Sequence, residues 1–130
     1  MTLSTPRAMV SQQSNFLRRH CDASTNSAGQ WVMPNGLPAG AVIVGAVVSV
    51  TTVFNGTTPH VTAGVVPGGT SIVGAAEASG AALGSAICVG WATGAQVAAT
   101  ADQDVYINVT GAPTLGVADV VIEFAPNIDG

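Results

Sequence analysis

The densest group of side chains that could do chemistry is the run His20-Cys21-Asp22, which places a base, a nucleophile and an acid side by side. Nucleophilic catalysis needs these types to converge on one point, with a further group that orients the base. Adjacent residues on a polar segment do not converge in this way, and the sequence offers no evident distant partner. We therefore predict no catalytic or metal site at this run.

The remaining acids and the second histidine give weaker patterns. His60 follows Pro59 at the start of a predicted strand, where a surface or hydrogen-bonded histidine is expected. Asp102, Asp104 and Asp119 could share a divalent cation, but calcium takes about six to eight oxygen ligands and no Gly-spaced acidic loop is present. Solvated carboxylates at strand edges are the simpler interpretation, and we predict no metal.

Glycine-rich and aromatic positions do not define a cofactor site either. A Walker phosphate loop needs a lysine and the chain has none, while a dinucleotide fingerprint needs a strand–helix context that is missing. We predict no cofactor and no enzymatic activity. Trp31 and Trp91 could stack on a sugar, but a tryptophan in a chain with 5% aromatic residues is more often packed in a core or an interface.

Charge is scarce and unevenly distributed. Charged residues make up 8% of the 130 residues, against about 25% in an ordinary globular chain. All three arginines (Arg7, Arg18 and Arg19) lie in the first 20 residues, and all seven acids follow them. A basic head on an acidic body repels nucleic acid over most of its surface, so we predict no nucleic-acid partner.

The apolar segments are too short or too interrupted to cross a membrane as a helix. Residues 1–20 also lack the apolar core of a secretory signal. We therefore expect no membrane partner and synthesis in a cytoplasm, where Cys21 and Cys88 are free thiols.

The sequence divides into two parts of different composition. Residues 1–30 are rich in Ser, Thr, Gln, Asn and Arg and contain only one of the 16 glycines, Gly29. We predict an N-terminal arm and linker here that orders against a partner, with one or two helical turns around Met9, Val10, Phe16 and Leu17 as the alternative. Residues 31–130 combine Val, Ala, Gly and Thr with regular turn signals, a composition that favours strands.

The strand pattern predicts an all-β, antiparallel β-sandwich or jelly roll for residues 31–130. We expect strands near residues 42–54, 60–66, 71–73, 86–91 and 96–100, and at 105–110 and 118–124. The first of these is apolar on both faces in its first half, as in a strand covered on both sides. Asn55-Gly56 and the loop 111–116 are predicted to close hairpins.

Two blocks of this sequence resemble a known family. "LPAGAVIVGAVVSVTTVFNGTTPHVTAG" (residues 37–64) and "ADQDVYINVTGAPTLGVADVVIEFAP" (residues 101–126) resemble small structural proteins of tailed bacteriophages, of the capsid decoration (cement) kind. The resemblance implies a β-sandwich or jelly-roll protein, often trimeric, on the outside of an icosahedral head. It implies binding to the major capsid protein and no catalytic residues.

The predicted function follows from this resemblance together with the composition. We expect a virion structural protein at the capsid surface, a homo-oligomer with a trimer favoured, that binds the major capsid protein and stabilises the head. The residues predicted to contact the partner are Arg7, Phe16, Leu17, Arg18, Arg19 and Trp31. The alternative is a carbohydrate- or receptor-binding sandwich of a phage fibre, tail or surface appendage, which requires Trp31 or Trp91 to be exposed in a groove.

Overall fold

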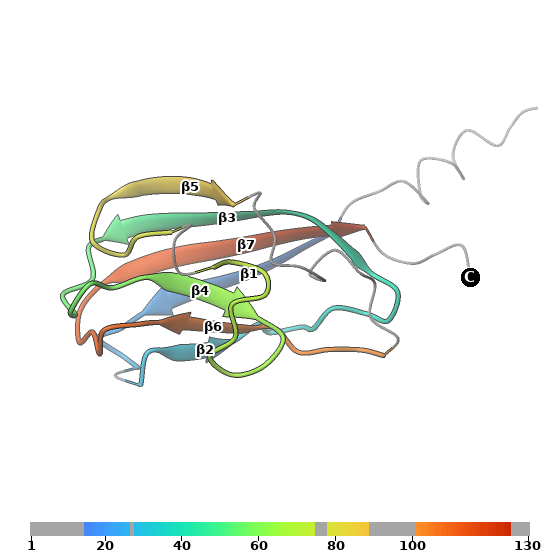
Figure 1. The fold of residues 1–130 in the computed structure, drawn as a ribbon, viewed down its shortest axis with the longest axis horizontal. Coiled ribbons are helices and arrows are strands. Elements are labelled where there is room, and N and C mark those ends of the chain that lie inside the picture. The colour runs from blue at the N-terminus through green and yellow to red at the C-terminus, as the bar shows by residue number, and fades with distance from the viewer. Residues whose placement is uncertain (1–14, 27, 75–77, 89–100, 126–130) are drawn as a thin grey trace, which may run out of the picture.

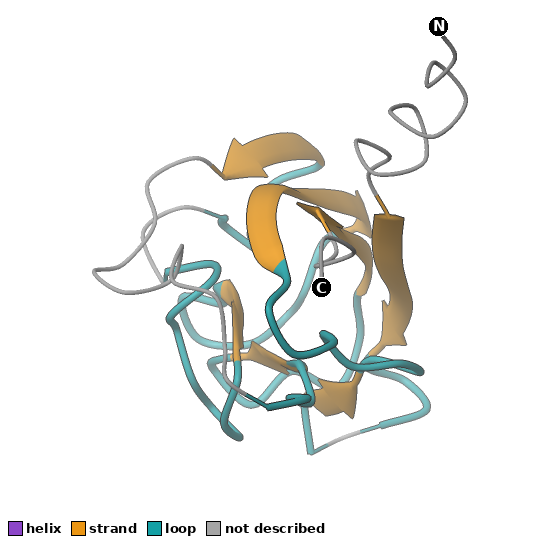
Figure 2. Cartoon of the chain, turned by 90° about the vertical axis from the view of Figure 1, so that its right-hand side faces the viewer, coloured by secondary structure: helices purple, strands orange, loops and turns teal. Residues whose placement is uncertain are grey.

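A computed structural model describes residues 15–26, 28–74, 78–88 and 101–125, with residues 85–88 described by their backbone alone. Two antiparallel sheets face each other and enclose the core (Figure 1), and Figure 2 shows strands and loops but no helix in these ranges. The predicted all-β sandwich is therefore confirmed. The more specific jelly-roll topology stays a prediction.

The first sheet has the strand order β1-β7-β3-β5 and the second sheet has the order β2-β6-β4. The strands of the first sheet are β1 (Asn15–Asp22), β3 (Val42–Thr52), β5 (Gly84–Cys88) and β7 (Val117–Ala125). The strands of the second sheet are β2 (Gln30–Val32), β4 (Val61–Gly64) and β6 (Tyr106–Val109).

Strand β7 has the clearest sequence pattern and a central position in the first sheet. It pairs with β1 on one side and with β3 on the other. Ala118, Val120, Ile122 and Phe124 are buried and alternate with half-buried residues, as the period of two predicts. Each fully buried valine or isoleucine of this kind contributes about 1.5–3 kcal/mol by leaving water.

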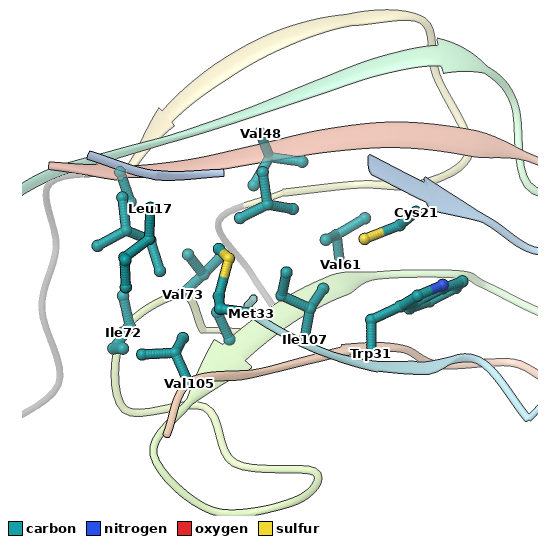
Figure 3. Packing of buried hydrophobic residues seen from close by; sticks show 14 of the residues in the cluster. Leu17, Cys21, Trp31, Met33, Val48, Val61, Ile72, Val73, Val105 and Ile107 are labelled. Carbon is teal, nitrogen blue, oxygen red and sulfur yellow. The ribbon is translucent and has the colours of Figure 1, made fainter. Parts of the chain in front are cut away.

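The core lies between the inner faces of the two sheets (Figure 3). Leu17, Cys21 and Val48 project into it from the first sheet. The second sheet and its flanking segments supply Trp31, Met33, Val61, Ile72, Val73, Val105 and Ile107. A core of mostly small, β-branched side chains explains how the chain folds with so few aromatic residues.

The segment after β4 covers the edge of the second sheet. Ala63 pairs with Val73 and His60 pairs with Ser79 through isolated bridges. Residues 71–73 therefore make a single bridge in place of the strand we predicted, while β5 confirms a strand near 86–88. The predicted strand at 96–100 lies outside the described residues.

Both predicted hairpins are wrong. The Asn55-Gly56 turn leads from β3 in the first sheet to β4 in the second, and the loop 111–116 leads from β6 back to β7 in the first sheet. An alternating pattern determines which face of a strand is buried, but it does not determine which strand lies beside it. Both loops cross between the sheets at the same end of the sandwich.

The side chain of Asn55 joins these two crossing loops. Its Oδ1 accepts hydrogen bonds from the backbone N–H groups of Thr114 at 2.8 Å and Leu115 at 3.1 Å. Its Nδ2 donates to Thr114 Oγ1 at 2.9 Å. The asparagine that suggested a local turn therefore makes a long-range contact, between segments 59 residues apart.

The predicted boundary between the arm and the sandwich needs a correction. Residues 15–22, which we assigned to the arm, form β1 and pair with β7 along all eight positions. The physical reason is that Leu17 and Cys21 bury their side chains in the core, so this segment gains as much from the sandwich as any other strand. Residues 1–14 lie outside the described residues, and an arm limited to them stays a prediction.

Candidate interaction surface

The outer face of the first sheet is shaped by a bulge in β3. Ile43 pairs with Phe124 and Gly45 pairs with Glu123, so Val44 is an extra residue between two successive pairs. Such a bulge re-aims the side chains around it. Here it allows Ile43 and Ala46 both to be buried, at a spacing of three, and leaves Val42 and Val44 on the outer face.

Four apolar side chains on this outer face are exposed. Phe16 on β1 is 62% exposed and Val44 on β3 is 50% exposed, with Val42 and Val47 of β3 beside it at 38% and 36%. Our prediction that the first half of β3 is covered on both sides is therefore wrong for this chain alone. Its inner face packs in the core, while its outer face meets solvent.

Glu123 of β7 lies in the middle of these apolar residues. It pairs with Phe16 on one side and with Gly45 on the other. A methyl group built at Gly45 would lie 3.6 Å from Glu123 Oε1, so the carboxylate leans over the position where β3 has no side chain. We call Phe16, Val42, Val44, Val47 and Glu123 the outer patch.

A second group of charges lies on the same face, further along β1 and β7. Asp119 Oδ1 is 3.0 Å from His20 Nδ1 and 3.6 Å from Arg18 Nη2. The Arg18 side chain is 70% exposed, so its ion pair with Asp119 contributes about 1 kcal/mol or less. The contact nevertheless keeps the arginine close to Asp119.

The six predicted contact residues do not form one surface. Phe16 and Arg18 lie on the outer face of the first sheet. Leu17 and Trp31 are 6% and 4% exposed and belong to the core. Leu17 projects into it from β1 of the first sheet, and Trp31 projects into it from β2 of the second sheet. The surface of this chain therefore does not present them to a partner, and Arg7 lies outside the described residues.

Arg19 occupies an unusual position. It shares the inner face of β1 with Leu17 and Cys21, is half-buried, and its Nε makes no hydrogen bond in the part of the chain that the structure describes. An inward-pointing charge on an edge strand is one of the devices that prevent a sheet from adding further strands. The residue thus fits a role in protecting the β1 edge.

The run His20-Cys21-Asp22 separates as expected for a strand. Cys21 is a buried free thiol, and burial raises its pKa from 9.0 to about 12, with the Arg19 charge acting in the opposite direction. Asp22 is half-buried, and a hydrogen bond from the Ser24 hydroxyl, followed by one from the Ser24 N–H, lowers the pKa of its carboxyl. His20 points to the outer face, so the three groups do not meet.

The other predicted candidates are also dispersed. Asp102 Oδ1 accepts a hydrogen bond from the Ala39 N–H at 2.8 Å, and with Asp104 it lines a surface hollow of about 430 Å³. Asp119 belongs instead to the outer face, with His20. Among residues 15–26, 28–74, 78–88 and 101–125, no three His, Cys, Asp or Glu side chains are placed to share a metal ion.

The aromatic and histidine positions give two further outcomes. Trp31 is buried against the core and offers no face to a sugar, whereas Trp91 lies outside the described residues. His60 is half-buried directly before β4, and its Nδ1 is buried without a hydrogen-bond partner in the described part of the chain. Within that same part, no helix long and apolar enough to span a membrane is found.

Of the outer patch, only Phe16 was predicted from the sequence as a contact residue, and the residues of β3 and β7 were missed. The available signal was Gly45, because a glycine inside a strand of β-branched residues often marks a bulge. That bulge reverses the inner and outer assignment of Ile43 and Val44, which a strict period of two places on the wrong faces.

Comparisons with known proteins find likeness in structure alone. No family model matches the chain, and no curated protein matches its sequence. A chain of the cyanophage Pam1 capsid asymmetric unit matches with a TM-score of 0.51 at 17% identity, over 88% of this chain and 84% of that chain. A chain of the acid-stable capsid of the Helicobacter pylori bacteriophage KHP30 matches with a TM-score of 0.52 at 15% identity, over 85% and 86% of the two chains.

These comparisons define the class of fold. The chain has a β-sandwich fold similar to that of chains found in two bacteriophage capsids, and the similarity extends over most of each chain. The sequence identities are too low to carry more than the fold itself.

Proposed function

We propose that this chain is a structural protein of a bacteriophage virion and acts as a decoration (cement) protein on the outside of the head. The observation that carries the proposal is the fold likeness to two capsid chains over more than four-fifths of every chain compared. The outer patch supports it, since exposed apolar side chains grouped on one face are typical of a protein that is buried against others.

The proposed partner is the major capsid protein, and the proposed mechanism is mass action. Copies that bind the assembled shell but not its dissociated subunits stabilise the shell by the free energy of their binding. No catalytic step is part of this role. We further propose that the chain acts as a homo-oligomer, with a trimer favoured, and that an arm at residues 1–14 adds contacts to a neighbour.

The test uses heads purified from a phage whose gene for this chain carries a stop codon. The purified full-length chain is mixed with these heads, and bound chain is measured by co-sedimentation. Saturable binding, together with a higher temperature of head disruption, is the expected result. Absence of binding to heads would overturn the decoration role.

The arm requires a truncation that respects the fold. Removing residues 1–20 would delete most of β1 and uncover β7, so a loss of binding would have no clear cause. Removing residues 1–14 leaves β1 complete and is the appropriate variant. We expect weaker binding with unchanged thermal unfolding; undiminished binding of this variant would contradict the arm proposal.

A further inference from the structure

We propose that the outer patch is the surface through which this chain docks on its partner, and that the partner presents an apolar area with a lysine or arginine at its centre. The inference rests on the proposed function, because it takes the capsid shell as the partner. It assigns the contact to the outer face of the first sheet, where the predicted contact residues include only Phe16 and Arg18.

The shape of the patch follows from the bulge. Strict alternation counted from the buried Ala46 would place Val44 on the inner face and Ile43 on the outer face. The bulge places Val42, Val44 and Val47 together on the outer face of β3, within one sheet of Phe16 on β1. Bulges that re-aim side chains are typical of functional positions in sheets.

The charge at the centre of the patch indicates the chemistry of the partner. Glu123 makes neither an ion pair nor a hydrogen bond within the described residues, although it lies between Phe16 and Gly45. Burying a lone carboxylate against an apolar partner is costly, and a well-placed cation on the partner offsets much of that cost. The partner that best covers the patch is therefore one that brings a cation to Glu123.

The described residues of a second copy of this chain offer little to meet this requirement. The chain has three arginines and no lysine. Of the two arginines in the described ranges, Arg18 is held near Asp119 and Arg19 lies on the inner side of β1. Two copies joined through this face would bring two Glu123 and two Asp119 carboxylates into one interface, with Arg18 of each copy as the arginine of the described ranges that faces them, so the acids repel. A different protein with a basic residue on an apolar surface fits the patch.

The experiment measures binding of full-length variants to heads that lack this chain. Val44→Ser removes apolar area from the patch, and Glu123→Gln removes its charge while keeping its shape. We expect each to weaken binding about tenfold or more. The loss caused by Glu123→Gln should shrink at high salt, where ion pairs are screened, while that of Val44→Ser should not.

Matched controls lie elsewhere on the same chain. Val66→Ser changes a valine that is 57% exposed in the loop after β4, away from the first sheet. Asp104→Asn removes an exposed carboxylate from the hollow beside residues 35–38. Both should bind as the unchanged chain does. Thermal unfolding of all four variants should stay within a few degrees of the unchanged chain, because the altered side chains are at least partly exposed.

The outcomes separate this inference from the proposed function. Binding of the unchanged chain with no effect of Val44→Ser or Glu123→Gln overturns the inference and leaves the decoration role intact. If the unchanged chain does not bind heads, both fail. If it self-associates in light scattering and either patch variant dissociates it, the occupant is a second copy, and the inference is again overturned.

Discussion

Replacing Asn55 tests whether the two crossing loops are held together by a side chain. Asn55→Ala removes two hydrogen bonds from backbone N–H groups and one to the Thr114 hydroxyl. Each hydrogen bond contributes about 0.5–1.5 kcal/mol, and the exposed site allows water to replace part of the loss. We expect the free energy of unfolding to fall by about 1–3 kcal/mol, which corresponds to roughly 4–12 °C in Tm.

Two further variants make the experiment specific. Asn55→Asp keeps an oxygen that accepts from both N–H groups, so its cost should be less than about 1 kcal/mol. Asn55→Gly keeps the freedom of a tight turn but loses the side chain, and should cost as much as Asn55→Ala. Urea unfolding followed by circular dichroism gives all three values. A glycine variant as stable as the unchanged chain would refute the reasoning, because it would show that the residue serves a local turn.

Two other predictions concern the core. Ile122→Ala should lower the free energy of unfolding by about 2–5 kcal/mol, whereas Val121→Ala, one residue along β7 and half-buried, should cost about 1 kcal/mol or less; similar values in urea unfolding would contradict the assigned faces. In a Cys88→Ser background, Cys21 should react with a disulfide reagent far more slowly in the folded chain than in guanidinium, since a pKa of about 12 in place of 9.0 makes the thiolate about a thousandfold scarcer. Because the folded pKa is the higher one, this thiol's contribution to stability is complete below pH 9 and is lost as the pH rises toward 12; a stability that increases over that range would contradict the assignment.

The sequence predicted which face of β7 is buried, but it did not predict which strands lie beside one another. The alternation in β7 identified its buried residues, because burial of one face is a local property of the strand. The strand that pairs with a given strand depends on whether the connecting loop returns to the same sheet or crosses to the other sheet. The same turn residues occur in both kinds of loop. Asn55 shows this directly, since its side chain bonds to residues that a local pattern cannot include.

The candidate surface was harder to predict for two physical reasons. In β1, Arg19 breaks the apolar alternation of Leu17 and Cys21, so a sheet strand has the composition of a polar arm. In β3, the extra residue Val44 reverses the faces on either side of the bulge. Phe16 and Arg18, which were predicted as contact residues, lie on the outer face, whereas Glu123 was not among the predicted contact residues.

The most direct test of the account is a cryo-electron microscopy map of the native phage particle at a resolution that traces side chains. We predict density for this sandwich on the outside of the head lattice, with the face that carries Val44 and Glu123 against a basic residue of the shell. Density for the chain in the tail or fibres, with none on the head, would contradict the central claim.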